Sequence, residues 1–330
     1  MKLKKDDKKT EQEKVEERRE EVLAQGRKFK YPLQYTKHRV VVNTILIAVI
    51  VLALIVVGGW FALYRLQMTD EVLYRVTRVL PVSVAEVDFE SVKFSDYLML
   101  YRSSIISVER QSGALTDDDN SKDLRARYKR TALSEAEKYA YAMKLGRELG
   151  IEVTNDEVKA EYERHRKVGG LDRSEEGFLK VLQDNFGLSE EEYKRILYLN
   201  LMEAKVEMKI DENANAVAGQ VETMLAGNGG NYQAVAEALG EAVNYEETGG
   251  MVDNRNIDGG RATEAMKLEP GGQSGKFVSL NGDGYYFVKL VAKSETAVNF
   301  VSIKVPFTEF DKRFEKLREA GKVREMIELE

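Results

Sequence analysis

The stretch VVVNTILIAVIVLALIVVGGWFALY, from Val40 to Tyr64, decides the architecture of this 330-residue chain. It carries no charged residue, and only Asn43 and Thr44 are strongly polar. At about 1.5 Å per residue, a helix of this length crosses a hydrocarbon core of about 30 Å. A cleaved signal peptide and a buried core helix are the two alternatives. The run is longer than the roughly 7 to 15 apolar residues of a signal peptide and lacks a small-residue cleavage pattern after it. We therefore expect residues 40–64 to be a retained anchor in a lipid bilayer.

The charges on either side of the anchor predict its orientation, because Lys and Arg resist translocation more than acidic residues do. Five basic and no acidic residues lie between Arg27 and Arg39, whereas basic and acidic residues are mixed after Tyr64. We expect residues 1–39 to form a charged cytoplasmic tail. The rest of the chain should then lie outside a cell membrane that it crosses once.

The part of the chain beyond the anchor is acidic, which bears on its partners. Residues 66–330 carry 36 basic and 48 acidic side chains, and this balance argues against nucleic acid as a partner. The run from Asp117 to Asn120 lacks the Gly and Glu that a calcium-binding EF-hand requires, so we expect a polar loop over residues 113–123. We expect neither a metal nor another cofactor, and the sequence predicts no oligomeric state.

The sequence next to the anchor predicts a helical domain at residues 82–210. An amphipathic connector occupies residues 65–81, a strand-like stretch follows over residues 82–94, and Ser95 is positioned to cap the next helix. Further helices are indicated by apolar residues at three- and four-residue intervals. Three helix starts are predicted from the S/T-x-x-E spacing, in which two side chains satisfy the free amides of a first helical turn: Ser134 with Glu137, Thr154 with Glu157, and Ser189 with Glu192.

After Asp211 the pattern changes to that of a small module with an antiparallel sheet, over residues 211–310. Two helices are predicted, at residues 214–225 and 232–239. The strands FVSL and GYYFVKLVA are joined by NGDG, whose residues suit the positive φ angles of a tight hairpin. A further strand, VNFVSIKV, precedes Pro306, and a charged helix is expected from there to the end, with residues 311–330 as a C-terminal helix. The fold class is therefore α+β.

The order of these parts resembles that of the SurA and PrsA type folding factors. The stretches VSVAEVDFESVKFSDY, ALSEAEKYAYAMKLGRELGIEVTNDEVKAEYE and GLSEEEYKRILYLNLMEAKV are similar to their N-terminal chaperone domain, with the helix junction of that family matched at residues 149–158. The module that follows resembles a parvulin, a peptidyl-prolyl cis-trans isomerase domain. NYQAVAEAL, the TGG at residues 248–250 and AMKLEPGGQSGKFVSLNGDGYYFVKL carry this resemblance. Together the two resemblances cover residues 82–310.

The chain departs from the parvulin pattern at the site residues. Parvulins carry a His in the first strand and another in the last, but this chain has only His38 and His165, and neither lies in the module. Tyr286 stands where the last-strand His is expected, and Ser302 is a counterpart of the first. The resemblance makes these two the catalytic candidates, although an aromatic residue packed in a strand is the simpler interpretation of Tyr286. At the usual Met and Phe positions the alignment gives Ile257 and Arg261. The substrate-binding candidates are Ile257 and Met266 in the module and Tyr139 and Met143 in the helical domain.

The first parvulin strand has no counterpart at the expected place, because the helix ending near Ile210 runs almost directly into the next helix. VNFVSIKVPFTEFDKRFEKL resembles the opening strand and helix of a parvulin, so residues 298–305 are a candidate replacement in the same sheet. The alternative is an appended strand and helix. A structure in which residues 298–305 do not pair with the sheet would exclude the replacement.

The resemblance implies a membrane-anchored folding factor that binds unfolded or newly exported polypeptides. Its isomerase activity is expected to be weak or lost. Two other functions stay open: an active prolyl isomerase, and an envelope scaffold with one fixed partner. Turnover of a proline peptide would indicate the isomerase, and one stoichiometric native partner would indicate the scaffold.

Overall fold

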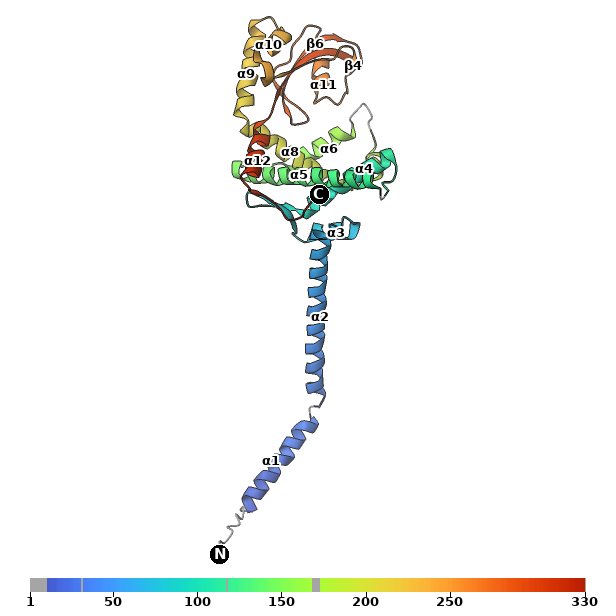
Figure 1. The fold of residues 1–330 in the computed structure, drawn as a ribbon, viewed down its shortest axis with the longest axis vertical. Helices are drawn as coiled ribbons and strands as arrows, with labels where there is room; N and C mark the ends of the chain where they lie inside the picture. The colour runs from blue at the N-terminus through green and yellow to red at the C-terminus, as the bar shows by residue number, and fades with distance from the viewer. Residues whose placement is uncertain (1–10, 31, 117, 168–172, 330) are drawn as a thin grey trace. The chain divides into compact units, whose positions relative to one another are not determined.

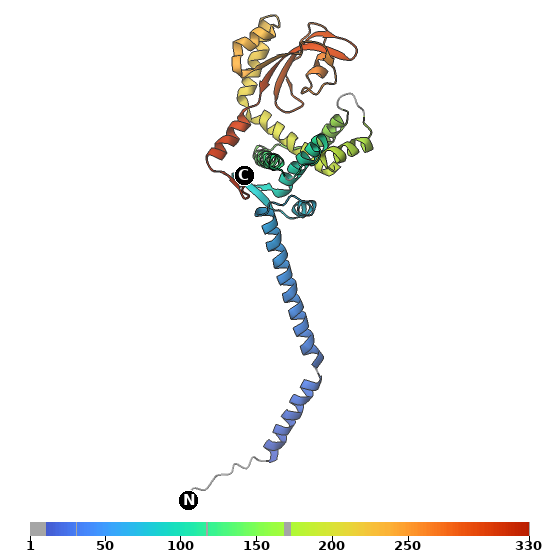
Figure 2. The same cartoon turned by 45° about the vertical axis from the view of Figure 1, so that its right-hand side comes forward.

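The chain divides into two compact units in the computed structural model, Met1–Leu66 and Gln67–Glu330. The structure describes residues 11–30, 32–116, 118–167 and 173–329, and for residues 27–30 and 32–38 it describes the backbone alone. The chain is α+β, with its helices and strands drawn in Figures 1 and 2.

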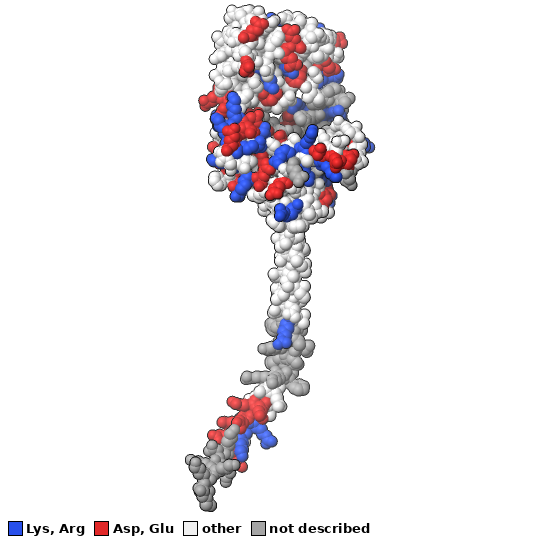
Figure 3. Space-filling view, in the orientation of Figure 1, with Lys and Arg blue, Asp and Glu red and all other residues white. Residues whose placement is uncertain are grey.

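The described part of the first unit contains α1 (Glu11–Lys30) and α2 (Pro32–Tyr64). The stretch Arg39–Tyr64 within α2 is long and apolar enough to cross a membrane. Thr44 fits this stretch because its hydroxyl donates to the carbonyl of Val40 at 2.8 Å, so its polar group is satisfied inside the helix. Residues 40–64 carry no charged side chain, and in Figure 3 this part of α2 is a white rod.

The second unit begins with α3 (Glu71–Val79), which lies in the predicted connector. Asp70 caps α3 by accepting from the amides of Val72 and Leu73. The strand-like stretch that follows is a hairpin of β1 (Ser83–Val87) and β2 (Glu90–Lys93), with a two-residue turn at Asp88 and Phe89.

Two of the predicted helix starts were wrong. The helix α4 (Phe94–Ser112) begins directly after β2 with Lys93 at its N-cap and without a side-chain cap, so Ser95 does not cap it. The helix α5 (Asp119–Leu149) begins where a polar loop was expected, because Asp118 accepts from the amide of Ser121 at 2.7 Å. Ser134 therefore lies inside α5 and caps nothing.

The other predicted starts are confirmed. Thr154 forms a complete capping box before α6 (Asn155–Arg166), and Ser189 does so before α8 (Glu190–Ile210). The helix α7 (Glu175–Phe186) lies between them. Apolar residues of these three helices share one core cluster, formed by Val158, Tyr162, Phe178, Leu182 and Leu197.

The end of the chain returns to the helical part. After α12 (Glu309–Glu319) the chain forms β8 (Val323–Glu325), which pairs antiparallel with β1 and gives the strand order β2-β1-β8. The prediction of a helix to the C-terminus was therefore wrong beyond Glu319. Phe310 and Phe314 of α12 are buried against Tyr141 of α5, at ring-centroid distances of 5.2 and 6.0 Å.

The larger sheet has the order β3-β7-β6-β5, with β4 also paired to β7. These strands are β3 (Asn244–Glu247), β4 (Val252–Asp253), β5 (Phe277–Val278), β6 (Gly284–Lys293) and β7 (Ala297–Pro306). Residues 298–305 thus pair with β6 on one side and with β3 and β4 on the other. Because residues 298–305 pair with the sheet, the structure does not exclude the replacement hypothesis.

Helices cover the two faces of this sheet. The helices α9 (Glu212–Gly227) and α10 (Tyr232–Leu239) were predicted and are present, and the short η2 (Gly240–Ala242), which was not predicted, follows them. They pack on the face that carries Tyr285, Phe287, Ile303 and Val305. The short α11 (Arg261–Met266) packs on the opposite face through Ala262 and Ala265, against Val288, Leu290, Val298 and Phe300.

The buried carboxylate of Asp211 accepts hydrogen bonds from backbone amides at both ends of the sheet module. One oxygen of Asp211 accepts from the amide of Ala214 at 2.8 Å and so caps α9. Its other oxygen accepts from the amides of Thr308 and Glu309, at 2.7 and 3.0 Å, at the start of α12. One side chain thereby satisfies free amides of two helices that are far apart in sequence.

Candidate functional site

Tyr286 and Ser302 lie close together on the face of the larger sheet that α11 covers. In the β6–β7 pairing, Tyr286 is opposite Lys304 and Val288 is opposite Ser302. The two candidate residues are therefore diagonal neighbours, with side chains on the same face because alternate residues of a strand point the same way. Both side chains are buried.

The guanidinium of Arg261 occupies the space beside them. Its Nε donates to the carbonyl of Asp258 at 2.9 Å, and one Nη donates to the Ser302 hydroxyl at 3.3 Å. The same Nη forms an ion pair with Glu246, which is directly opposite Ser302 in the β3–β7 pairing. The guanidinium carbon also lies 5.1 Å from the centre of the Tyr286 ring, within cation–π range. A charged network therefore stands where the resemblance to parvulins implies an apolar wall.

The loop before α11 brings Arg261 to this position. Gly259 and Gly260 have positive φ angles, and a Cβ on Gly259 would lie 2.7 Å from the Ser279 hydroxyl and 3.2 Å from the Tyr286 ring. Only glycine permits this close approach of the loop to β6. The carboxylate of Asp258 then accepts from the amide of Ala262, which fixes the first turn of α11.

Tyr286 is enclosed by other groups as well. The Phe277 ring is stacked at 6.0 Å, and the Lys304 ammonium lies 5.8 Å from the Tyr286 ring and pairs with Asp283. Burial, and after it the charge of Asp283, raises the pKa of Tyr286. Its hydroxyl therefore stays protonated at neutral pH and is a possible hydrogen-bond donor, but not a base.

The two substrate-binding candidates of the module lie in different surroundings. Met266 is half-buried against the apolar cluster under α11. Ile257 is 69% exposed and lines a cleft of about 340 Å³. The end of α6 forms one wall of this cleft, and Arg164 donates to the carbonyl of Leu280 across it at 3.3 Å. Its lining also includes Lys167, Arg255, Asn256 and Asn281.

The candidates in the helical part lie together on α5. Tyr139 is buried, and its hydroxyl donates to the Asn200 side chain of α8. Burial raises the pKa of Tyr139. Met143, one turn further along, is half-buried. The structure thus brings Tyr286 and Ser302 together and keeps Tyr139 and Met143 on a separate element.

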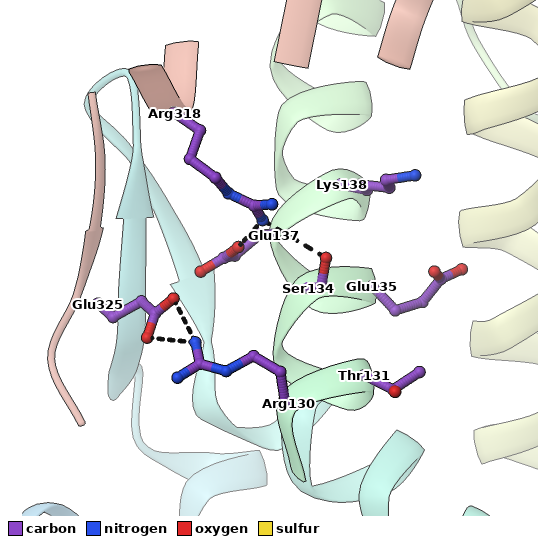
Figure 4. A pocket seen from close by; sticks show the side chains of 8 residues that line it. All are labelled: Arg130, Thr131, Ser134, Glu135, Glu137, Lys138, Arg318 and Glu325. Atoms are coloured by element: carbon purple, nitrogen blue, oxygen red, sulfur yellow. Dashed lines mark hydrogen bonds and ion pairs between the residues drawn. The ribbon is translucent and has the colours of Figure 1, made fainter. Parts of the chain in front are cut away.

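A second cleft, of about 450 Å³, lies where α5 meets the returning C-terminal segment (Figure 4). Arg130 binds both oxygens of Glu325 at 2.6 and 2.7 Å, and Arg318 donates to Glu137 at 3.2 Å. Glu137 is buried, and burial together with the charge of Glu325 raises its pKa to about 7. This cleft joins two segments of the helical part and contains neither of the catalytic candidates.

Sequence reasoning did not find the charged groups around these sites. Glu246 and Asp283 pair with residues 15 and 21 positions away, and Asp211 also accepts from Thr308 across 97 residues, so no local pattern marks these contacts. Glu137 was interpreted as part of a helix cap. A signal for its burial was nevertheless present, because Leu133, Glu137 and Tyr141 are four residues apart and therefore on one helix face.

The comparisons with known proteins agree with one part of this architecture. A family model described as the SurA-like N-terminal domain matches residues 34–207, from within α2 to within α8. No curated protein and no solved structure matches the chain.

Proposed function

Because the chain belongs to the SurA-like N-terminal domain family, we propose that it is a membrane-anchored folding factor that binds unfolded or newly exported polypeptides outside the cytoplasm. The match to the family over residues 34–207 is the observation that carries this proposal. It spans more than half of the chain and includes both the apolar helix and the helical part that follows it.

The anchor is residues 40–64 in this proposal. The apolar stretch is long enough to span a bilayer, and the basic residues before it favour a cytoplasmic N-terminus. Trp60 and Tyr64, whose rings lie 5.9 Å apart, stand at the end of the stretch, where aromatic residues favour the membrane–water interface.

Client polypeptides bind, in this proposal, at the cleft that contains Ile257. Ile257 and Leu280 are large exposed apolar side chains, and Arg164, Lys167 and Arg255 surround them. Exposed apolar groups can contact many unfolded sequences without a fixed pattern of polar contacts. The half-buried Met143 of α5 is a second candidate contact, because the thioether side chain adapts to different partners.

The sheet module is, in this proposal, a parvulin-like domain with weak or lost isomerase activity. The inner position of β7 supports residues 298–305 as the replacement for the first parvulin strand. Prolyl isomerisation has a barrier of about 18–20 kcal/mol, and lowering it requires a dry pocket with donors aimed at the twisted amide. Here Ser302 accepts from Arg261, and the Arg261–Glu246 pair stands beside Tyr286. These contacts disfavour entry of an apolar prolyl ring.

The test is suppression of aggregation by the full chain in lipid nanodiscs, with several unrelated unfolded proteins. The proposal expects suppression for all of them, and Ile257→Asp should weaken it several-fold. Val291→Asp is the matched control, since Val291 is also an exposed apolar residue of the module but does not line the cleft. Capture of one stoichiometric native partner without any suppression would contradict the proposal and indicate a scaffold.

A protease-coupled assay on a proline peptide tests the isomerase part separately. We expect the wild-type chain and Tyr286→Phe to give the uncatalysed rate. Turnover well above that rate, lost in Tyr286→Phe, would show an active isomerase.

A further inference from the structure

The helix α3 has an apolar face that is left exposed by the part of the chain that the structure describes. Val72 and Val79 are 70% and 81% exposed, and Val76 and Leu80 are also exposed. At 100° per residue these four positions lie within one arc of the helix. Exposed apolar side chains gathered on one face mark a site of interaction with a protein or a membrane.

The other two faces of α3 have partners, so the helix is held in a fixed rotation. Tyr74 and Thr77 are buried, and the Tyr74 hydroxyl donates to Glu192 of α8. Glu71, Arg75 and Arg78 form the third face, with Glu71 paired to Arg102 and Arg78 paired to Glu191. Because these contacts fix the helix, Val72 and Val79 cannot turn inward without breaking them.

The chain between α2 and α3 is short and is itself attached to the second unit. Gln67 donates to the carbonyl of Glu328 at 2.5 Å, and Asp70 caps α3. Only Arg65 and Leu66 lie between the last residue of α2, Tyr64, and Gln67. Extended chain spans at most about 3.6 Å per residue, so these two residues keep Gln67 close to the end of α2 along the chain.

We propose that α3 lies on the surface of the membrane that faces away from the cytoplasm, with Val72, Val76 and Val79 at the boundary of the acyl chains. This inference rests on the proposed anchor, because a spanning α2 places α3 within a few residues of the interface. Amphipathic helices bind such surfaces through apolar burial together with basic side chains near the phosphates. Arg65, in the sequence between α2 and α3, is the basic residue next to this boundary. The lipid contact would hold residues 67–330 against the bilayer by one particular face.

The chain contains no Cys and one Trp, so single probes can be placed without background. Val79→Cys and Arg75→Cys, each with a nitroxide label, would be prepared in the full chain in nanodiscs of phosphatidylethanolamine and phosphatidylglycerol. We expect the Val79 label to collide several-fold more with oxygen and several-fold less with a water-soluble nickel chelate than the Arg75 label. Val72→Cys repeats the measurement on the same face, and Ile257→Cys gives the aqueous reference.

Quenching of Trp60 by nitroxide-labelled lipids shows independently whether α2 lies in the bilayer. If Trp60 is quenched while the Val79 and Val72 labels meet the nickel chelate as freely as the Ile257 label, α3 does not touch lipid and only this inference fails. If Trp60 is not quenched, the proposed anchor fails and this inference falls with it. Shielding of the Val79 label that appears only at high protein-to-lipid ratio would indicate a second copy of the chain and would also overturn it.

Discussion

The helical part and the sheet module of the second unit differ in how far apart in sequence their structure-determining contacts are. In the helical part, capping boxes at Thr154 and Ser189 fix helix starts within four residues of chain. In the module, β7 reaches β3 across more than fifty residues, as in the pair Asn244 and Lys304. The helical part nevertheless depends on one long-range element, because α12 and β8 pack on α5 and β1. The comparison shows that the matched family region, residues 34–207, is completed by a segment outside it.

The largest expected effect tests whether the helical part depends on the packing of α12 against α5. Phe314→Ala should lower the free energy of unfolding by about 3–5 kcal/mol, because it removes a fully buried ring that packs on Tyr141. Chemical denaturation measures the loss, and hydrogen exchange should locate it in α5 before the module. Phe89→Ala is the control, since Phe89 is 90% exposed and its loss should change stability by less than about 0.5 kcal/mol. Equal effects of the two variants would contradict the role assigned to α12.

The next effect concerns the junction between the two parts. Asp211→Ala should cost about 2–4 kcal/mol, because it removes two helix caps, each worth about 1–2 kcal/mol. Hydrogen exchange should increase at the first turns of both α9 and α12. Asp70→Ala removes a single cap, that of α3, and should cost about half as much. Increased exchange at α9 alone would show that α12 does not depend on this carboxylate.

A third prediction concerns pH. Burial, and after it the charge of Glu135, raises the pKa of Glu203 to about 8, and burial with the charge of Asp311 raises that of Glu207 to about 7. Both values exceed the ordinary 4.5, so the folded state binds more protons than the unfolded state between pH 4.5 and 8. Stability should therefore fall as pH rises through this window, by on the order of 1 kcal/mol for each group.

Glu203→Gln should remove part of this slope in denaturation curves recorded from pH 4.5 to 8. Glu157→Gln is a control of opposite sign, because hydrogen bonds from Lys205 and the Thr154 amide lower the pKa of Glu157 to about 2. The stability that Glu157 contributes is present above 4.5 and is lost as pH falls through about 2. A wild-type curve that is flat from pH 4.5 to 8 would contradict the prediction for Glu203.

The smallest effect compares two residues with the same sequence signal. Thr154→Ala should cost about 1 kcal/mol, because Thr154 caps α6, whereas Ser134→Ala should cost less than about 0.5 kcal/mol. Thermal unfolding measured on the two variants side by side would distinguish them. A larger loss for Ser134→Ala would mean that its contact with Arg318, at 3.5 Å, matters more than its position suggests.

These pairs also show how far the sequence predicts the fold. The S-x-x-E spacing marks a cap only where no helix precedes it, and Leu124, Tyr128 and Ala132 continue the apolar face of α5 upstream of Ser134. The strand β8 has three residues and depends on β1, so no local pattern could reveal it. Tyr286 and Ser302 were identified by resemblance and do lie together. The Arg261–Glu246 pair beside them arises from strand pairing, which spacing in the sequence does not encode.

The carboxylate of Asp211 also makes the module separable in principle. Since the amides of Ala214 and Thr308 bind the same side chain, the chain departs and comes back at one point. A segment with adjacent ends can be excised or exchanged with little disturbance to its host. Joining residue 211 to residue 308 by a short Gly-Ser link should then leave α8 and α12 in register. Insertion, exchange or loss of the sheet module at this point would therefore leave the helical part intact.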